Sequence, residues 1–325
     1  MTNSDYKLLA KTMALRLGQA LPDLVNEDQV GFIKGRRAST LIRLVDDLIE
    51  HLNSTNSPGL LVSIDYCQEF DSISKDFMIN SFKKFGFGEE FVRWVEVLMA
   101  DTQSCISYCG WISEYFPAEA GIRQGCPFSP LAFVLALELL AITIRSNESI
   151  KGINMGRNGD MVEKIIKIAL YADDVTLFLK DELSMRHALT IFQNFSSFSG
   201  LRINQSKSKA MWLGNRKNSE DTFYGFNWEK RIKILGIYFE NDKSASSIEE
   251  NWLERLEKIK RIIHSWERRN LSIMGKICII KTFLISQLVY VMQALILPDK
   301  FLTEVNRIFF RFLWRKRDCN RRAFE

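Results

Sequence analysis

The pattern of apolar and polar residues divides the chain into amphipathic helices at both ends and a mixture of helices and short strands between them. Residues 5–20 place leucines and a methionine between lysines and arginines at helical spacing, which predicts a helix. From residue 249 onward, an apolar stripe from Trp252 to Trp266 predicts a long helix whose tryptophans face a core. The remaining predicted helices are 40–53, 73–85, 88–101, 131–146, 183–199, 271–296 and 299–314.

Strands are predicted where apolar runs are short and bounded by turn residues. Leu60 to Ile64 is one such run, and it ends at Asp65. The runs 165–170 and 175–179 flank four residues and together predict a β-hairpin. The other predicted strand regions are 104–117, 207–213 and 232–240.

Charge is unevenly placed along the 325 residues. Residues 251–325 contain 16 Lys and Arg against 7 Asp and Glu, and since the whole chain is +5, the first 250 residues carry −4. An acidic body with a basic C-terminal part suits a protein that holds a cation in one place and a polyanion in another, although basic helices are also common as simple solvated surfaces. The shift in composition near residue 245 marks the best domain boundary.

The cysteines and apolar segments exclude several classes of protein. Six cysteines occur without repeated Cys-x-x-Cys pairs and with only three histidines, so a zinc site is not expected. Cys105 and Cys109 are spaced so that they could pair, but their setting indicates a reduced, intracellular core. The longest apolar stretch, Leu131 to Ile144, contains Glu138 and is too short to span a membrane. We expect an intracellular protein, in the nucleus, the cytoplasm or both, with no membrane partner.

The four residues Tyr171-Ala172-Asp173-Asp174 form the turn of the predicted hairpin. Adjacent carboxylates repel each other at a buried edge unless a cation lies on them. Mg²⁺ favours one or two carboxylates together with substrate phosphates. Taken alone, two adjacent aspartates in a turn are more often solvated than bound to a metal. The other motifs of the chain are therefore needed to choose between these two interpretations.

Asp65 supplies a third carboxylate, because it ends an apolar strand at the rim of a sheet. If this strand neighbours the hairpin, three carboxylates converge, which is the minimum for two divalent ions and an in-line displacement at phosphorus. Phe70, five residues later, is placed to turn back under the sugar of a nucleotide and exclude a 2′-hydroxyl. By itself, Phe70 reads as a core aromatic.

The segment from Gln29 to Arg37 combines two glycines with cations. Glycine lets a backbone approach a phosphate closely, so the segment is a candidate phosphate-binding loop. As an isolated signal it is weak.

An ordered set of motifs resembles the reverse transcriptases of LINE-type non-LTR retrotransposons. The motifs are Asp65-x4-Phe70, RQGCPFSP at 123–130, YADD at 171–174, SGLRINQSKSK at 199–209 and Leu235-Gly236-Ile237. The resemblance covers nearly the whole chain, including DYKLLAKTMALRL at 5–17 and QVGFIKGR at 29–36. It implies an α+β, right-hand polymerase with partial fingers at 1–60, an antiparallel-sheet palm at 61–245 that carries inserted fingers segments, and a basic helical thumb at 246–325.

The resemblance also implies roles for individual residues. Asp65, Asp173 and Asp174 match metal ligands, and Lys207 matches a lysine that helps to protonate the leaving pyrophosphate. The positions that match nucleotide-binding residues are Tyr66, Phe70, Gln124, Gly125, Lys11 and Arg16. Leu235 and Gly236 match the strand that holds the primer end. Candidates for binding the nucleic-acid backbone are Lys258, Arg261, Arg268, Arg269, Lys276 and the run 315–317. The implied cofactor is Mg²⁺, as two ions, with Mn²⁺ as an alternative, and the implied partners are an RNA template, a DNA primer and dNTPs, with no evident protein partner.

Two departures from the family pattern concern activity. Glu69 stands where the family has a small residue, and Phe128 stands where it has leucine. A Glu69 side chain that points into the site would repel the triphosphate, whereas one that points outward would matter little. The chain also begins late and shows no endonuclease or Cys/His-rich segment, so we expect a portion of a longer element protein.

The alternatives follow from these departures. The leading interpretation is an RNA-directed DNA polymerase, and the alternative is an inactive reverse-transcriptase remnant that binds RNA. A group II intron maturase ranks third. An RNA-dependent RNA polymerase ranks last, because Phe70 disfavours ribonucleotides.

Overall fold

A five-stranded sheet forms the centre of the molecule, in the strand order β13-β12-β1-β10-β9. The computed structural model describes residues 4–100, 102–156, 164–242, 245–293 and 295–314. All neighbouring strands of the sheet are antiparallel except the outer β12–β13 pair, which is parallel. The predicted antiparallel-sheet palm is therefore confirmed.

The helices and strands lie close to their predicted positions. The helices are α1 Ser4–Leu24, α2 Ala38–Ser54, α3 Glu69–Ser72, α4 Lys75–Lys84, α5 Glu89–Met99, α6 Ser129–Ser146, α7 Glu182–Ser199, η1 Gly214–Arg216, α8 Ala245–Glu267, α9 Ile273–Ile279, η2 Ile280–Leu284, α10 Ile285–Met292 and α11 Asp299–Trp314. The strands are β1 Gly59–Ile64, β2 Tyr66–Cys67, β3 Gln103–Ser104, β4 Ser107–Tyr108, β5 Trp111–Ile112, β6 Phe116–Pro117, β7 Ile153–Asn154, β8 Ile165–Ile166, β9 Ile168–Tyr171, β10 Asp174–Leu179, β11 Arg202–Ile203, β12 Lys209–Leu213, β13 Asn227–Trp228, β14 Arg231–Ile234 and β15 Ile237–Glu240.

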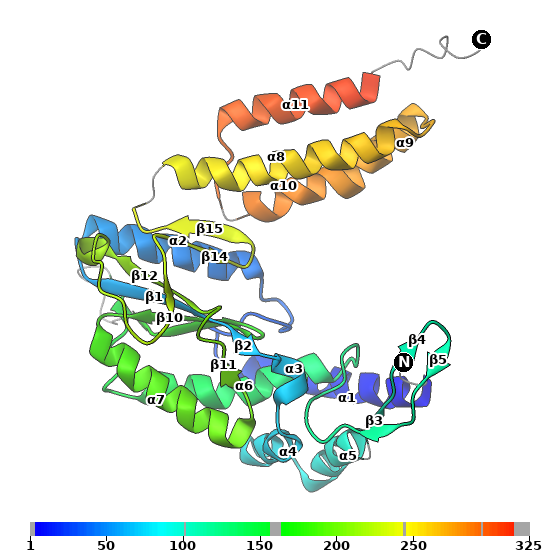
Figure 1. The fold of residues 1–325 in the computed structure, drawn as a ribbon, viewed down its shortest axis with the longest axis vertical. Coiled ribbons are helices and arrows are strands. Elements are labelled where there is room, and N and C mark those ends of the chain that lie inside the picture. Colours follow the sequence, from blue (N-terminus) through cyan, green and yellow to red (C-terminus); the bar gives the residue numbers. More distant parts are fainter. Residues whose placement is uncertain (1–3, 101, 157–163, 243–244, 294, 315–325) are drawn as a thin grey trace.

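Both faces of the sheet are covered, and β1 shows how its sequence requires this. Leu60, Val62 and Ile64 join a core cluster with α1, α4, α5, α6 and α7, whereas Leu61 joins a second cluster with α2 and the C-terminal helices. Side chains alternate across a strand, so a strand that is apolar at successive positions needs cover on both faces. In Figure 1 the sheet lies between α2 above and α6 and α7 below.

The C-terminal helices α8, α9, α10 and α11 stack as a separate layer beyond α2 and the β14–β15 hairpin (Figure 1). The predicted helix 271–296 is confirmed as one continuous helical segment from Ile273 to Met292, but its central part, η2, is π-helical. Trp252 is 1% exposed, which confirms that it is a core residue, and Trp266 packs on the same cluster. Of the described helices, Ser129–Ser146 and Ile273–Met292 are long and apolar enough to cross a membrane by length and composition alone, and the first is mostly buried against the sheet.

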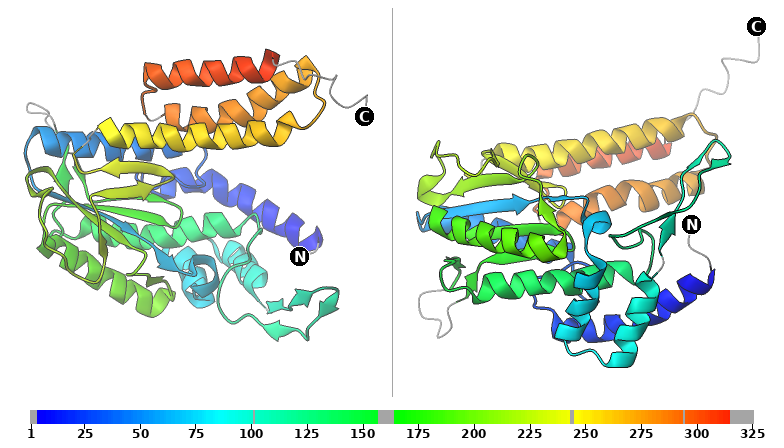
Figure 2. Two further views of the ribbon diagram at one scale, coloured as in Figure 1. Left: turned by 45° about the horizontal axis from the view of Figure 1, so that its top comes forward. Right: turned by 60° about the horizontal axis from the view of Figure 1, so that its bottom comes forward.

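Strands β3 to β6 form a narrow two-stranded ribbon that projects from the body beside the N-terminal end of α1 (Figures 1 and 2). In the sequence the ribbon comes after α5, whose phenylalanine packs with one on α4. Phe128 stacks on Phe82 with ring centroids 5.7 Å apart, so the larger residue at this family leucine position fills the core.

The loop between α1 and α2 is fixed by one arginine. Arg36 donates hydrogen bonds to the backbone carbonyls of Pro22, Val25, Asn26 and Gln29. The last carbonyls of a helix have no partner within the helix, so a guanidinium group near the end of α1 satisfies them. Arg36 is thus a structural residue, and the prediction that its segment binds phosphate is wrong for this side chain.

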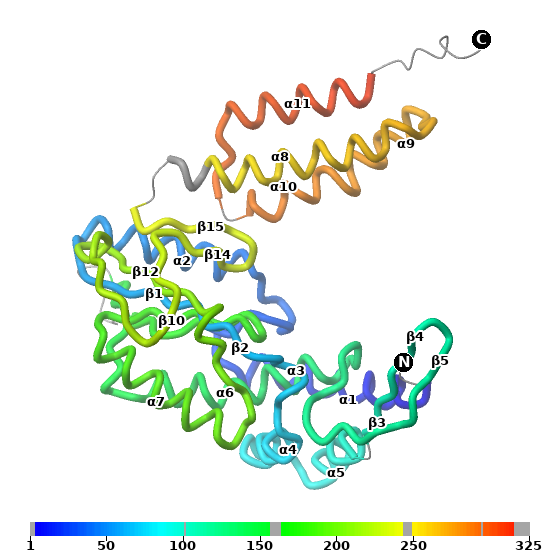
Figure 3. Tube along the Cα trace, in the orientation of Figure 1, coloured from blue at the N-terminus to red at the C-terminus, as the bar shows by residue number. Residues whose placement is uncertain are grey.

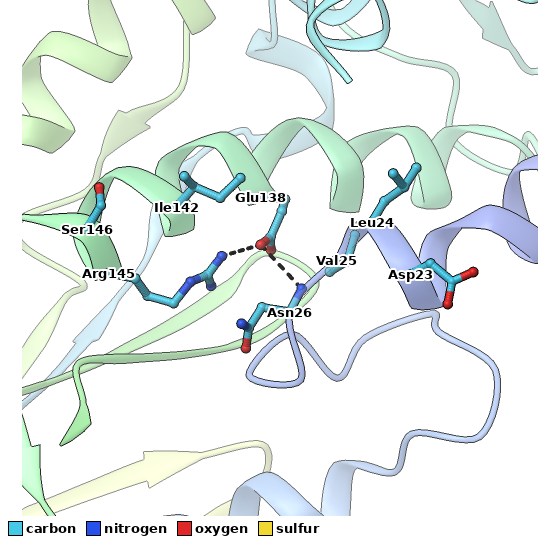
Figure 4. Close-up of a pocket in the computed structure, with 8 residues that line it drawn as sticks. All are labelled: Asp23, Leu24, Val25, Asn26, Glu138, Ile142, Arg145 and Ser146. Atoms are coloured by element: carbon cyan, nitrogen blue, oxygen red, sulfur yellow. Dashed lines mark hydrogen bonds and ion pairs between the residues drawn. The ribbon is translucent and has the colours of Figure 1, made fainter. Parts of the chain in front are cut away.

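A buried ion-pair network joins the same loop to α6. Arg145 pairs with Glu138 on its own helix and donates to both carboxylate oxygens of Asp28 at 2.8 Å. Glu138, with 2% of its side chain exposed, also accepts from the N–H of Asn26. Figure 4 shows the contacts of Glu138 with Arg145 and Asn26, beside a pocket between the end of α1 and α6. Burial raises the pKa of both carboxyl groups, and the charge of Arg145 opposes this rise by favouring their ionised forms.

Replacing Arg145 should therefore destabilise the fold. We expect Arg145→Met to lower the free energy of unfolding by about 2–3 kcal/mol, because two carboxylates lose their cation in a largely buried setting. Urea unfolding followed by circular dichroism measures this. The matched control is Lys83→Met, since Lys83 and Glu96 pair with both side chains about half exposed, and its effect should stay below about 0.5 kcal/mol. If the two substitutions lowered the free energy of unfolding equally, the ion-pair network of Arg145 would contribute no more to stability than an exposed pair.

Candidate active site

The pairing of β1 with β10 brings the predicted carboxylates to one edge of the sheet. Ile64 pairs with Val175, so the next residues on the two strands, Asp65 and Asp174, continue the same antiparallel register. Asp174 pairs with Tyr171 across the β9–β10 hairpin, which leaves Ala172 and Asp173 as its turn. The predicted hairpin and the predicted adjacency of the two strands are both present.

The carboxylates repel one another. The pKa of Asp174 is raised to about 6, chiefly by burial and then by the charges of Asp173, Asp65 and Glu69. Burial and then Asp65 raise the pKa of Asp173. Asp174 nevertheless keeps an exposed surface, so these groups lie at the mouth of the site and can be reached from solvent.

The backbone of Asp65 is held by the loop that follows β11. Its N–H donates to the Ser208 hydroxyl at 3.0 Å, and its carbonyl accepts from Asn204 N–H at 2.8 Å. Figure 3 shows the chain running from β1 through β2 to α3, with β11 beside β2. The loop also places Lys207 at the acidic edge, where its charge opposes the rise in the pKa of Glu69.

Glu69 lies near the carboxylates of the site. Burial raises the pKa of its carboxyl, and the charges of Asp173 and Asp65 add to this rise. It begins the short helix α3 directly after Gln68, whose φ of +53° turns the chain sharply. A fourth acidic group is therefore close enough to the aspartates to interact with their charges, and its contact with a substrate stays a prediction.

Phe70 is held rigidly at the edge of the core. Its ring stacks on Phe133 of α6 with centroids 4.9 Å apart. Its carbonyl accepts from Ile122 N–H at 2.7 Å, which ties the RQGCPFSP loop to the same place. Gln124 and Gly125 in this loop are exposed, and Gly125 has a φ of +79°. The structure thus ties Phe70 to the start of the loop that carries Gln124 and Gly125.

Tyr66 differs from its predicted role. Its side chain is 2% exposed, lies near Phe192 and belongs to the core, so only its backbone remains for a nucleotide to contact. Its hydroxyl is buried without a described partner, and burial raises its pKa. Of the two cations on α1 that were predicted to bind the nucleotide, Arg16 lies over the Phe91 ring at 5.6 Å and Lys11 is exposed to solvent. No described contact joins either of these two cations to the acidic edge.

Gln29 is a site residue that the sequence analysis missed. It is 1% exposed, and its side-chain Oε1 accepts from Ala172 N–H at 3.1 Å and from Gly31 N–H at 2.9 Å. Its Nε2 donates to the Ala172 carbonyl at 3.5 Å. The available signal was a glutamine two residues before a glycine, but the nearby cations favoured a phosphate loop instead.

Leu235 and Gly236 form a turn, which corrects the prediction of a continuous strand. Both have positive φ, +47° and +78°, and they connect β14 to β15 as a two-residue hairpin loop. The Leu235 carbonyl accepts from the Tyr290 hydroxyl at 2.7 Å, and the Gly236 carbonyl accepts from Arg255 at 3.0 Å. Two C-terminal helices, α10 and α8, therefore hold the turn. Burial raises the pKa of Tyr290, and the charges of Tyr171 and Asp174 add to this rise, which indicates that Tyr290 lies near Asp174.

The predicted backbone-binding cations differ in their surroundings. Lys258 and Arg261 are exposed on α8, and Arg268 follows them at its end. Arg269 lies over the Trp266 ring at 4.5 Å. Lys276 instead donates to the Leu313 carbonyl at 3.2 Å near the end of α11, so it has a structural partner. Residues 315–317 lie outside the described part of the chain.

The donor set fits a divalent cation that is shared with a substrate. Asp65 Oδ2 is buried without a hydrogen-bond partner, and the neighbouring groups are carboxylates that repel each other. Within the described residues no three acidic, histidine or cysteine side chains form a ready-made cage. Mg²⁺ is usually bound by one or two carboxylates, waters and substrate phosphates rather than by an all-protein cage, so this open arrangement suits it.

Comparison with known proteins agrees with this geometry. A profile of the family described as "Reverse transcriptase (RNA-dependent DNA polymerase)" matches residues 1–239. The chain is 27% identical over 320 residues, or 97% of its length, to the Xenopus laevis "Transposon TX1 uncharacterized 149 kDa protein". It is 26% identical over 202 residues, 62% of its length, to the "Retrovirus-related Pol polyprotein from type-2 retrotransposable element R2DM" of Drosophila melanogaster. The chain spans 24% and 18% of these two relatives.

A solved structure shares the fold. The apo telomerase from Candida tropicalis matches 94% of this chain and 50% of its own chain, with a TM-score of 0.50 and 11% sequence identity. At this identity the likeness concerns the fold alone.

The turn at Leu235 and Gly236 generates a stability prediction. Tyr290→Phe removes only the hydroxyl that binds the Leu235 carbonyl, and we expect it to lower the free energy of unfolding by about 1 kcal/mol. Urea unfolding gives the value. Tyr238→Phe is the matched control, because its hydroxyl accepts only from the exposed Lys233 at 3.3 Å, and its effect should be below about 0.5 kcal/mol. A Tyr290→Phe protein as stable as the wild type would show that α10 does not hold this turn.

Proposed function

Since the chain belongs to the reverse transcriptase (RNA-dependent DNA polymerase) family, we propose that it extends a primer 3′-hydroxyl with dNTPs on an RNA template, as part of a non-LTR retrotransposon protein. The observation that carries the proposal is the convergence of Asp65, Asp173 and Asp174 at one sheet edge beside Phe70.

Asp65, Asp173 and Asp174 would hold Mg²⁺, and we propose that two ions bind there. Bound there, the cations would lower the pKa of the primer hydroxyl and neutralise the triphosphate. The chain itself orients the carboxylates. Asp65 is fixed through its backbone by Ser208 and Asn204. Lys207, on the same loop, would donate a proton to a pyrophosphate oxygen as it leaves.

Substrate selection follows from the setting of Phe70. Its ring cannot move aside easily, because it stacks on the buried Phe133 and its carbonyl is bonded to Ile122. A rigid ring at the sugar excludes a 2′-hydroxyl by contact rather than by hydrogen bonding. The site therefore favours deoxynucleotides.

Binding of the template and primer would come from exposed cations. Lys258, Arg261 and Arg268 lie exposed along and just beyond α8, and Lys and Arg contacts to phosphate hold nucleic acid without reading its sequence. The turn at Leu235 and Gly236 would contact the primer end through its backbone. Hydrogen bonds from α8 and α10 hold this turn, so it would connect the helices that carry these cations to the active site.

A second candidate function is an RNA-binding remnant without polymerase activity. The nearness of Glu69 to the aspartates favours it, because a fourth carboxylate would repel a triphosphate. Salt-dependent binding of RNA without nucleotide incorporation would be its signature.

The polymerase proposal predicts the behaviour of an isosteric variant. Asp173→Asn should reduce primer extension on an RNA template by about 10³-fold or more, because the amide keeps the shape but supplies no charge to a cation. Incorporation of a labelled dNTP measures this. The control is Asp47→Asn, an exposed aspartate on α2, which should extend primers like the wild type. Equal extension by Asp173→Asn and the wild type would overturn the proposal.

Glu69 separates the two candidate functions. Removing its charge should lower the dNTP concentration for half-maximal extension by about 3- to 10-fold, since one repulsive carboxylate is removed from the triphosphate. Glu69→Ala and Glu69→Gln are compared by steady-state primer extension, because both remove the charge and only one changes the volume. If the wild type is inactive and either variant extends primers, the remnant interpretation holds. Unchanged KM in both variants would contradict any contact between Glu69 and the substrate.

A further inference from the structure

Gln29 contacts the backbone on both sides of Ala172. Its Oε1 accepts from the N–H of the peptide that joins Tyr171 to Ala172, and its Nε2 donates to the carbonyl of the peptide that joins Ala172 to Asp173. Holding these two peptides fixes both φ and ψ of Ala172. Because the second peptide also carries the nitrogen of Asp173, the starting position of the Asp173 side chain is fixed as well.

Ala172 needs such support. Its φ of +56° lies in the left-handed region, which disfavours a residue with a Cβ. Residues held in that region persist when their surroundings determine the conformation. Ala172 is 2% exposed, so water does not compete for its N–H and carbonyl. The buried amide of Gln29 is the side chain that binds both groups.

Gly31 allows the close approach that this contact requires. A Cβ at Gly31 would lie 2.3 Å from the backbone nitrogen of Ala172, so only glycine fits against the turn. Gly31 N–H also donates to the same Gln29 oxygen. The spacing Gln29-x-Gly31 is thus explained by contact with the hairpin turn and not by a phosphate.

The segment that carries Gln29 is itself anchored to the body. Val30 N–H donates to the Leu170 carbonyl and Leu170 N–H donates to the Asp28 carbonyl, both at 2.8 Å, so the segment lies along the edge strand β9. Arg145 holds Asp28 from α6, and Arg36 binds the Gln29 carbonyl. The blue loop between α1 and α2 in Figure 1 is this segment.

We infer that Gln29 is a positioning residue for the reaction: it holds Ala172 in the left-handed conformation and thereby places the Asp173 carboxylate for metal binding. This inference rests on the proposed function of the site. It assigns no direct contact between Gln29 and substrate.

The test uses Gln29→Met in the full chain, because methionine keeps the length of glutamine without its amide. We expect kcat of primer extension to fall on the order of 10- to 100-fold, while the KM for dNTP and the Kd for an RNA–DNA duplex stay within about threefold. Hydrogen exchange measured by mass spectrometry should be at least about 10-fold faster at the 170–174 turn. Gln19→Met, an exposed position on α1, is the control and should match the wild type in each measurement.

A second substitution separates positioning from simple loss of stability. Glycine adopts positive φ without a steric penalty. Ala172→Gly added to Gln29→Met should therefore recover at least about one third of the lost logarithm of kcat. Slower extension by Gln29→Met in strict proportion to loss of duplex binding, or no recovery in the double variant, would overturn the inference.

Two measurements are independent of polymerase activity, so the inference can fail separately from the proposed function. Binding of Mn²⁺ alone, followed by electron paramagnetic resonance, should weaken about 10-fold in Gln29→Met. Together with the exchange rates of the turn, this result decides the matter even if the wild-type chain incorporates no nucleotide. Unchanged Mn²⁺ affinity and unchanged exchange at 170–174 would show that Gln29 does not position the turn.

Discussion

Mutual repulsion of carboxylates at one edge of the sheet is the constraint on which the arrangement of this protein depends. The register of β1 against β10 places Asp65 beside Asp174, and the hairpin turn adds Asp173. Burial strengthens this repulsion, since fewer waters solvate the charges. Two of the carboxylates are held through the backbone by neighbouring segments: the 204–208 loop holds Asp65, and Gln29 holds the turn that carries Asp173. A site that is unfavourable without a cation is thereby kept open for one.

Local pattern was sufficient to predict the elements, and motif order was sufficient to predict the fold. The apolar run before Asp65 and the paired runs around YADD required only strand periodicity, and the helices at both ends required only a 3.6-residue period. What the residues alone left open was the adjacency of the two strands, because Asp65 and Asp173 are far apart in the chain and only pairing across the sheet joins them. The described residues show that pairing directly.

The errors in the sequence-based predictions have a common physical origin. Leu235-Gly236 resembles a strand because it is apolar, yet both residues have positive φ, a property that depends on the partners of their carbonyls on α8 and α10. The segment that contains Arg36 was a weak candidate for phosphate binding because glycines let a backbone approach a phosphate, whereas here Arg36 binds the carbonyls near the end of α1. Tyr66 was predicted to contact a nucleotide, but its side chain is buried in the core. Gln29 was not predicted as a site residue, but it binds the hairpin turn. Both outcomes depend on burial by segments that are distant in the sequence. The nearness of Glu69 to these carboxylates likewise depends on the left-handed Gln68 before it.

The central claim is that Asp65, Asp173 and Asp174 form a divalent-cation site at this edge of the sheet. Anomalous diffraction from crystals soaked in Mn²⁺ tests it most directly, because the manganese signal locates the metal without reference to activity. The account predicts an anomalous peak bound by Asp65 together with at least one aspartate of the hairpin turn. Crystals in which manganese binds elsewhere, while Lys207 pairs with these carboxylates in its place, would contradict it.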